Sequence, residues 1–162
     1  MKITTIEEMN LQDFKTKLED IFNVKIDKIL ICILSEEEFS HFRTAEWVVG
    51  FAFPRRNAVF VIEEHSSNRS SEEWLKVIKH EIVHVFYENK FHSVMPYWLN
   101  EGMACYLSGQ QKFRAEISIS DLMKYHNSAD KDIYNVGYNA VKLMLGGKEL
   151  GGKEYDKTKK SD

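Results

Sequence analysis

The sequence predicts an α+β fold, in which a small sheet formed in the first half of the chain is combined with several helices. Two runs rich in β-branched and aromatic residues, 47–53 and 58–62, predict strands. Helices are indicated at Ser35 and Ser70, because each of these serines stands three residues before a glutamate, the spacing of a capping box.

The first 34 residues predict a helix and then a strand. Thr4 and Thr5 can cap a helix whose apolar residues recur at a spacing closer to 3.6 than to 2. Those apolar residues are Ile6, Met9, Phe14, Leu18 and Ile21. Residues 24–34 are rich in isoleucine and valine, which favours a strand, and Ser35 then starts a short helix.

A β-hairpin and a long helix are predicted next. The runs 47–53 and 58–62 are separated by residues 54–57, whose proline and asparagine favour a turn, so we expect the two runs to pair. The helix that Ser70 starts is expected to continue to about Asn89.

A second helix is predicted shortly afterwards. Pro96 suits the first turn of a helix and Gly109 suits the position just past its end, so we expect a helix over residues 96–108. Residues 117–119 predict a brief extended segment, and Ser120 is expected to cap a short helix.

The last predicted helix covers residues 132–145. From Gly146 the chain repeats Gly-Gly-Lys-Glu and ends in a polar, lysine-rich run with too little apolar surface to fold. A chain of 162 residues with 43% apolar residues fits one compact domain. We therefore predict a single domain over residues 1–145 and a flexible tail over residues 146–162.

The charge composition argues against a nucleic-acid partner. The 22 basic and 25 acidic residues are spread along the chain and give a formal net charge of −3, so no extended positive field is expected. No run approaches the roughly 18 apolar residues of a membrane span, and the first residues do not resemble a signal peptide. We therefore expect a cytoplasmic protein without a membrane partner, in which Cys32 and Cys105 are reduced, packed thiols.

The segment His80-Glu81-Ile82-Val83-His84 lies inside the helix that Ser70 starts. His80 and His84 are four residues apart, hence about 40° apart around the helix axis, so both imidazoles can bind one metal ion. Glu81 lies about 60° from His84, where its carboxylate can reach a water on the metal without being a ligand. A catalytic zinc ion is typically bound by three protein ligands and keeps one open position. One more ligand must therefore come from a residue outside this segment.

Glu101 is the best candidate for the third ligand. It stands 17 residues beyond His84, on a predicted helix that a six-residue loop could fold back alongside the first. A site of three histidines is disfavoured, because that pattern requires a glycine and a histidine where this chain has Tyr87 and Lys90. We therefore predict one zinc ion bound by His80, His84 and Glu101.

These residues resemble the gluzincin metallopeptidases, the group that includes thermolysin-like and aminopeptidase N-like enzymes, and especially the small bacterial peptidases of that clan. The resemblance covers about residues 24–145 and includes the predicted hairpin. Three motifs carry it: Lys-His-Glu-Ile-Val-His-Val-Phe at 79–86, Pro-Tyr-Trp-Leu-Asn-Glu-Gly-Met-Ala at 96–104, and Tyr-Asn-Val-Gly-Tyr at 134–138. The second motif looks like the family's third-ligand helix.

The resemblance implies a zincin-like metalloprotease fold, with a small twisted sheet, an active-site helix and C-terminal helices. It also implies that the edge strand of the sheet, here residues 58–62, lines the cleft above the metal and can pair with an extended peptide. The implied activity is zinc-dependent hydrolysis of peptide bonds in a peptide or protein substrate, with Glu81 as general base. In the aminopeptidase-like branch, a tyrosine three residues before a glycine helps to stabilise the oxyanion; Tyr134 matches that spacing, with Tyr138 as its substitute.

The chain also departs from the family. Many relatives carry a carboxylate four residues after the third ligand, where this chain has Cys105, a weak hydrogen-bond partner, so weaker zinc binding or less well oriented ligands are expected. The extra domain and the Gly-rich motif with which aminopeptidases select their substrates are not found, so aminopeptidase specificity is not expected.

Two other functions fit the same ligands. One is a catalytically degenerate zincin that acts as a zinc-stabilised protein-binding module, and the other is a zinc hydrolase of non-peptide amides. Glu81 favours catalysis, because a purely structural site has no use for a positioned general base.

Overall fold

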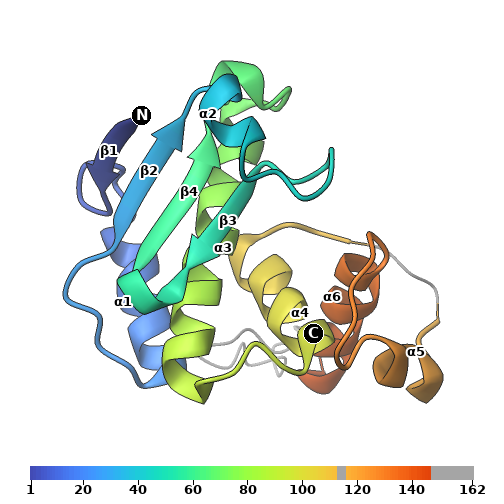
Figure 1. Ribbon diagram of the computed structural model, residues 1–162. Helices are drawn as coiled ribbons and strands as arrows, with labels where there is room; N and C mark the ends of the chain where they lie inside the picture. The colour runs from blue at the N-terminus through green and yellow to red at the C-terminus, as the bar shows by residue number, and fades with distance from the viewer. Residues whose placement is uncertain (113–115, 147–162) are drawn as a thin grey trace, which may run out of the picture.

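The computed structural model describes residues 1–112 and 116–146, and its fold is α+β (Figure 1). From residue 147 on, the predicted tail lies outside the described residues. Four strands form one mixed sheet in the order β1-β2-β4-β3. They are β1 (Lys2–Thr5), β2 (Leu30–Leu34), β3 (Gly50–Phe53) and β4 (Ala58–Ile62). β2 and β4 run parallel, and both outer pairs are antiparallel.

The predicted hairpin is confirmed by the antiparallel pairing of β3 with β4. A short 3-10 turn, Pro54–Arg56, joins the strands, and Asn57 closes it in the left-handed conformation with φ 47°. Asparagine tolerates that conformation better than most residues.

The predicted edge strand is wrong. Residues 58–62 form β4, which lies between β2 and β3 inside the sheet. The parallel pairing of Leu30 in β2 with Ala58 in β4 occupies the side of β4 that a hairpin alone would leave open. β3 is therefore the edge strand on this side of the sheet.

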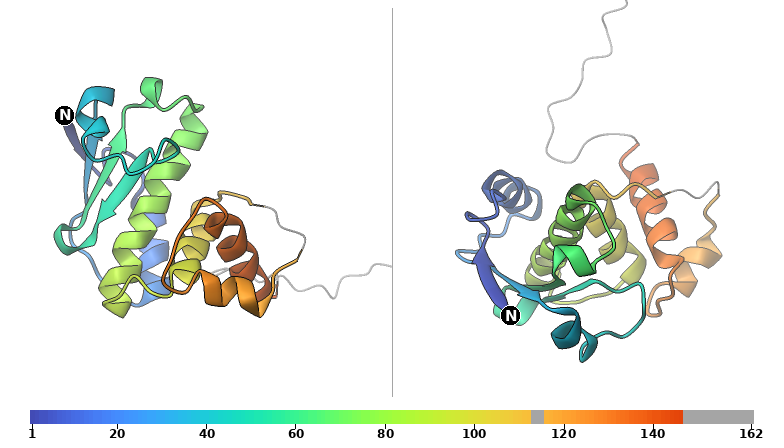
Figure 2. Two further views of the ribbon diagram at one scale, coloured as in Figure 1. Left: turned by 45° about the vertical axis from the view of Figure 1, so that its right-hand side comes forward. Right: turned by 90° about the horizontal axis from the view of Figure 1, so that it is seen from above.

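Six α-helices are described, together with the 3-10 turns Pro54–Arg56 and Glu64–Ser66. They are α1 (Gln12–Phe22), α2 (Glu36–Ser40), α3 (Ser71–Phe91), α4 (Tyr97–Ser108), α5 (Ile119–Lys124) and α6 (Ile133–Met144). Figures 1 and 2 show α3 between the sheet and a group formed by α4, α5 and α6. Among the described helices, none combines the length and the apolar character that a membrane span requires.

The main core lies between the sheet and two helices, α1 and α3. Apolar side chains of α3 such as Ile78 and Ile82 are fully buried, in one cluster with Val59 and Val61 of β4 and Leu18 of α1. Burying a side chain of this size contributes about 1.5–3 kcal/mol, so this contact fixes where α3 crosses the sheet. The opposite face of the sheet is covered in part by α2, through a smaller cluster around Phe39.

The predicted first helix is wrong over its first half. Residues 2–5 form β1, paired with β2 through contacts such as Ile3 opposite Cys32, and the helix begins only at Gln12. Asn10 adopts a left-handed conformation with φ 55°, which separates the first turns from α1. Ile6 therefore matches the helical spacing only by accident. It lies in a turn, and its side chain is buried in the core.

The predicted strand over residues 24–34 is too long, because only Leu30–Leu34 pairs in the sheet. Ser120 does not cap a helix: Ser118 caps α5 by a capping box with Asp121. α5 begins at Ile119, the last residue of the extended segment predicted at 117–119. The other predicted helices are confirmed to within two residues at their ends. Both cysteines are free and buried, as expected.

A buried ion pair on α1 allows a test of stability against pH. Lys15 Nζ lies 2.8 Å from Glu19 Oε1, and both side chains are only 9% exposed. The hydrogen bond from Lys15, with help from Lys25, lowers the pKa of Glu19 to about 2. Because this carboxyl titrates near 4.3 in an unfolded chain, its stabilising contribution is full above that pH and disappears as the pH falls towards 2.

We expect Glu19→Gln to lower the free energy of unfolding by about 2 kcal/mol at neutral pH, because it leaves the Lys15 ammonium buried without its partner. The difference from the wild type should shrink between about pH 4.5 and pH 2. Urea unfolding followed over this pH range measures it, with the exposed Asp20→Asn on the same helix as control. An equal loss of unfolding free energy in Glu19→Gln at pH 7 and at pH 2.5 would contradict the expectation.

Candidate metal centre

Helix α3 brings His80, Glu81 and His84 to one side of the molecule. The helix starts at a capping box in which the Ser70 side chain accepts from the Glu73 amide and Glu73 accepts from the Ser70 amide. Because its apolar stripe is held against the sheet, the imidazoles of His80 and His84 are turned towards α4, with ring centres 4.8 Å apart. The motif His80–His84 therefore lies on the side of α3 that faces the group of α4, α5 and α6.

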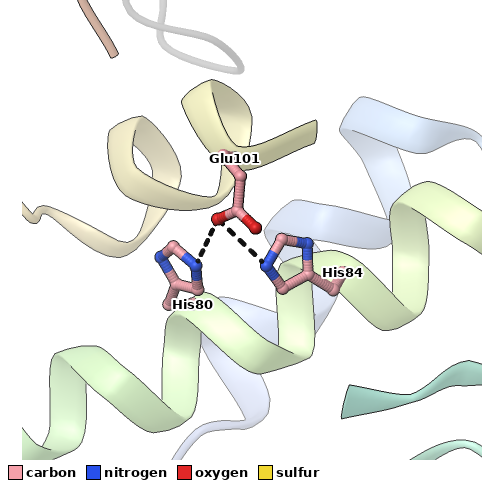
Figure 3. Close-up of side chains that lie close together, drawn as sticks. All are labelled: His80, His84 and Glu101. Carbon is pink, nitrogen blue, oxygen red and sulfur yellow. Dashed lines mark hydrogen bonds and ion pairs between the residues drawn. The ribbon is translucent and has the colours of Figure 1, made fainter. Parts of the chain in front are cut away.

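Helix α4 brings Glu101 to the same place (Figure 3). Its first turn is anchored by backbone hydrogen bonds from Tyr97 to His126 and from Trp98 to Tyr125. Glu101 Oε2 lies 3.1 Å from His80 Nε2 and 3.5 Å from His84 Nε2. The structure thus brings together the three residues that the sequence predicted as ligands.

The geometry of these three side chains fits a metal ion. Their ligand atoms all lie within 4.8 Å of one another. Zinc bonds of about 2.0–2.2 Å at tetrahedral angles place neighbouring ligand atoms roughly 3.3 Å apart, close to the two separations between Glu101 and the histidines. The group could therefore hold a metal ion.

Asn100 is a residue of the site that the sequence analysis missed. Its side-chain amide donates to the Val94 carbonyl at 3.2 Å, which directs its Oδ1 towards His84 Nδ1 at 2.7 Å. With an oxygen as partner, His84 Nδ1 carries the proton, and Nε2 keeps the lone pair that a metal needs. The only signal in the sequence was a polar residue next to Glu101 on the same predicted helix; the structure shows that Asn100 is buried.

Cys105 is the corresponding neighbour of His80. Its thiol donates to Gln110 Oε1 at 3.8 Å, which leaves the sulfur to accept from His80 Nδ1, also at 3.8 Å. Cys105 thus occupies the supporting position that the sequence assigned to it, and it selects the same tautomer as Asn100 does for His84. A sulfur acceptor is weaker than an oxygen, so His80 is held less firmly.

The pKa values of the three side chains are shifted because a carboxylate lies between two imidazoles. Burial opposes the charge of His84, but Glu101 outweighs this effect and raises the pKa of His84. For His80, the Cys105 sulfur and Glu101 outweigh burial and raise its pKa well above its usual range. Burial likewise opposes the charge of Glu101, yet the two histidines hold the pKa of Glu101 far below its usual range. Glu101 therefore stays ionised, as a metal ligand must be.

Glu81 lies beside the group without belonging to it. It is only 8% exposed, and burial raises the pKa of its carboxyl. Helix α3 passes close beneath the start of β3 here, since a Cβ on Gly50 would lie 3.2 Å from Glu81 Cγ. A carboxylate with a raised pKa beside a metal group has the properties of a general base.

Tyr134 joins the site through the contact between α4 and α6. A Cβ on Gly102 would lie 2.2 Å from the Gly137 carbonyl oxygen, so the two helices can approach this closely only with glycine at the crossing. The crossing places the Tyr134 ring 6.1 Å from the His80 ring. Tyr138, the substitute candidate, is buried instead against Tyr106, with ring centres 5.9 Å apart.

A cleft of about 860 Å³ reaches the site at His80. Its lining includes His80, Glu81 and Tyr134, together with the segment from Trp47 to Gly50 that leads into β3. Burial, together with nearby acidic groups, raises the pKa of Tyr134 well above its usual range, so its hydroxyl stays protonated and can donate. The cleft therefore presents an ionisable carboxylate, Glu81, and a hydrogen-bond donor, Tyr134, together with the candidate ligand His80.

We expect Asn100→Ala to weaken zinc binding by about 10–100-fold, because His84 loses the partner that fixes its tautomer and orientation. Competition with a fluorescent zinc chelator measures the affinity. Asn139→Ala on α6, where the side chain donates to the Asn135 carbonyl and has no other hydrogen bond to a described residue, is the control. An unchanged affinity in Asn100→Ala would show that Asn100 does not support the site.

Comparison of the chain with known protein families, with curated protein sequences and with solved structures gave no match. Its function is therefore inferred from the geometry of the site.

Proposed function

We propose that the protein is a zinc-dependent metallopeptidase of the gluzincin type, with a zincin-like fold. The observation that carries the proposal is a group of two histidines and one carboxylate, one of whose members, His80, lines an open cleft together with a separate buried carboxylate, Glu81. Two imidazoles and one carboxylate are a common ligand set of catalytic zinc, and three protein ligands leave one coordination position open.

His80, His84 and Glu101 would hold the ion. When bound, zinc would lower the pKa of a water in the open position and polarise the carbonyl of a substrate. Glu81 accepts a proton from the attacking water and passes it to the leaving amine, a task that suits a carboxyl whose pKa is raised. Tyr134 donates a hydrogen bond to the oxyanion that forms on the substrate.

The edge strand supports a peptide as substrate. β3 is a free edge of the sheet, and Gly50 at its start lines the cleft above Glu81. An extended peptide can add to such an edge through main-chain hydrogen bonds, which would lay its carbonyl groups along the site. This assigns to β3 the function that the sequence analysis gave to residues 58–62.

The proposal is tested by incubating the zinc-loaded protein with a library of peptides derived from a proteome digest and locating cuts by mass spectrometry. We expect new peptide termini that disappear when zinc is removed by a chelator and return when zinc is added back. Stoichiometric zinc binding without any cleavage would contradict the proposal and favour a zinc-stabilised binding module or a hydrolase of non-peptide amides.

A further inference from the structure

The cleft carries more positive than negative charge outside the reacting groups. Its lining includes four cations, Arg69, Lys76, Lys112 and Lys131. This is unexpected for a chain whose formal net charge is −3. Besides Glu81, two acidic residues, Glu73 and Asp132, line the same cleft, and both accept hydrogen bonds from neighbouring residues. Glu73 caps α3 through Ser70, and Asp132 accepts from Asn135 at 3.2 Å.

Lys112 and Lys131 are the cations best placed to meet a substrate. Lys76 is paired with Glu72 at 2.6 Å, whereas neither Lys112 nor Lys131 forms an ion pair with another described residue. Instead, each ammonium lies over an aromatic ring of the cleft: Lys112 Nζ is 5.9 Å from the centre of the Tyr134 ring, and Lys131 Nζ is 6.0 Å from that of Trp47. Such cation–π contacts hold a lysine in place without neutralising its charge.

The two lysines lie near the candidate metal ligands. The Tyr134 ring that holds Lys112 is itself 6.1 Å from the His80 ring. An extended peptide advances about 3.3 Å per residue, so a side chain within about four residues of the scissile bond can reach Lys112. Lys131 precedes α6 and lines the same cleft from the side of Trp47.

We propose that this cleft selects peptides that carry aspartate or glutamate within about four residues of the scissile bond, with Lys112 and Lys131 as the residues that determine this preference. The inference deepens the proposed function and rests on it for the cleavage step. Acidic side chains gain favourable charge interactions with both ammonium groups in a partly enclosed cleft, whereas basic side chains are repelled.

The test separates binding from cleavage. The probe is a mixture of decapeptides of alanine, leucine and tyrosine whose four central positions are each either glutamate or glutamine. The mixture is passed over immobilised, zinc-loaded Glu81→Gln protein, and the bound fraction is read by mass spectrometry. We expect glutamate to be enriched over glutamine by about fivefold at low salt, as for two partly exposed charge contacts, and the enrichment to vanish at 1 M salt.

Variants are made in the same Glu81→Gln background. Lys112→Gln with Lys131→Gln should abolish the enrichment, and the double change to glutamate should reverse it. The matched control is Lys142→Gln on α6, an exposed lysine outside the cleft, which should keep the full enrichment. An equal yield of glutamate and glutamine peptides from the parent protein, or an enrichment that survives Lys112→Gln with Lys131→Gln, would overturn the inference.

Cleavage of the same mixture by the wild type distinguishes the two proposals. Preferential cutting of glutamate peptides supports both. Cutting without preference overturns only the inference about acidic residues. Selective binding without any cutting contradicts the proposed peptidase and overturns the selection of a scissile bond with it.

Discussion

Glu81→Gln is expected to abolish peptide hydrolysis while the protein still binds zinc. The substitution keeps the shape of the side chain but removes the carboxylate that, in the proposed mechanism, accepts a proton from the attacking water. General-base catalysis contributes about 10²–10⁴-fold, so kcat/KM should fall by at least about 100-fold. Steady-state cleavage of a peptide identified in the library experiment measures the loss, and a metal assay on the same sample measures zinc.

The control for this substitution is Glu88→Gln, which lies on the same helix, is half-buried and belongs neither to the ligand group nor to the cleft lining. We expect it to retain wild-type activity. Full activity of Glu81→Gln would mean that another group is the base. Loss of zinc in Glu81→Gln would assign Glu81 to the ligands and leave the site without a base.

The second large effect is expected from the ligands. His84→Ala removes one of the three proposed ligands, so zinc affinity should fall by more than the roughly 10–100-fold that is typical when a supporting residue is lost. At a free zinc concentration of 100 times its own Kd, the wild type should gain about 2.7 kcal/mol in its free energy of unfolding, whereas His84→Ala should gain almost nothing at the same concentration. Chemical unfolding with and without zinc measures both.

His92→Ala is the matched control, because His92 stands at the C-cap of the same helix and is outside the ligand group. The effect of zinc should also depend on pH. Glu101 raises the pKa of His84 in the free site, so protons compete with zinc there above the usual range of an imidazole, and apparent affinity should fall as the pH drops from about 8 to 6. Equal stabilisation of the wild type and His84→Ala would show that zinc acts elsewhere.

Local signals in the sequence were sufficient for most of the fold. Capping boxes at Ser35 and Ser70 and the glycine after α4 marked helix ends correctly, because they act through neighbouring backbone groups. The first helix and the edge strand were wrong for the opposite reason. Pairing of β1 with β2, and of β2 with β4, joins segments about 30 residues apart, and no local spacing records it.

The proximity of His80, His84 and Glu101 could be predicted from local signals alone. The helical period alone places His80 beside His84, and a short connection brings Glu101 back to them. The positions of the Asn100 side chain and of the lysines of the cleft could not be predicted in this way. Asn100 depends on a bond to the Val94 carbonyl, and Lys112 on the position of Tyr134 across the cleft, so both follow from tertiary contacts.

The most direct test of the proposed zinc site is anomalous diffraction at the zinc absorption edge from crystals of the zinc-loaded protein. We predict one strong peak within about 2.0–2.2 Å of His80 Nε2, His84 Nε2 and a Glu101 carboxylate oxygen, with water as the remaining ligand and Glu81 within reach of that water. A peak at another place, or a closed site in which a fourth protein side chain such as Cys105 completes the tetrahedron, would contradict a catalytic zinc centre.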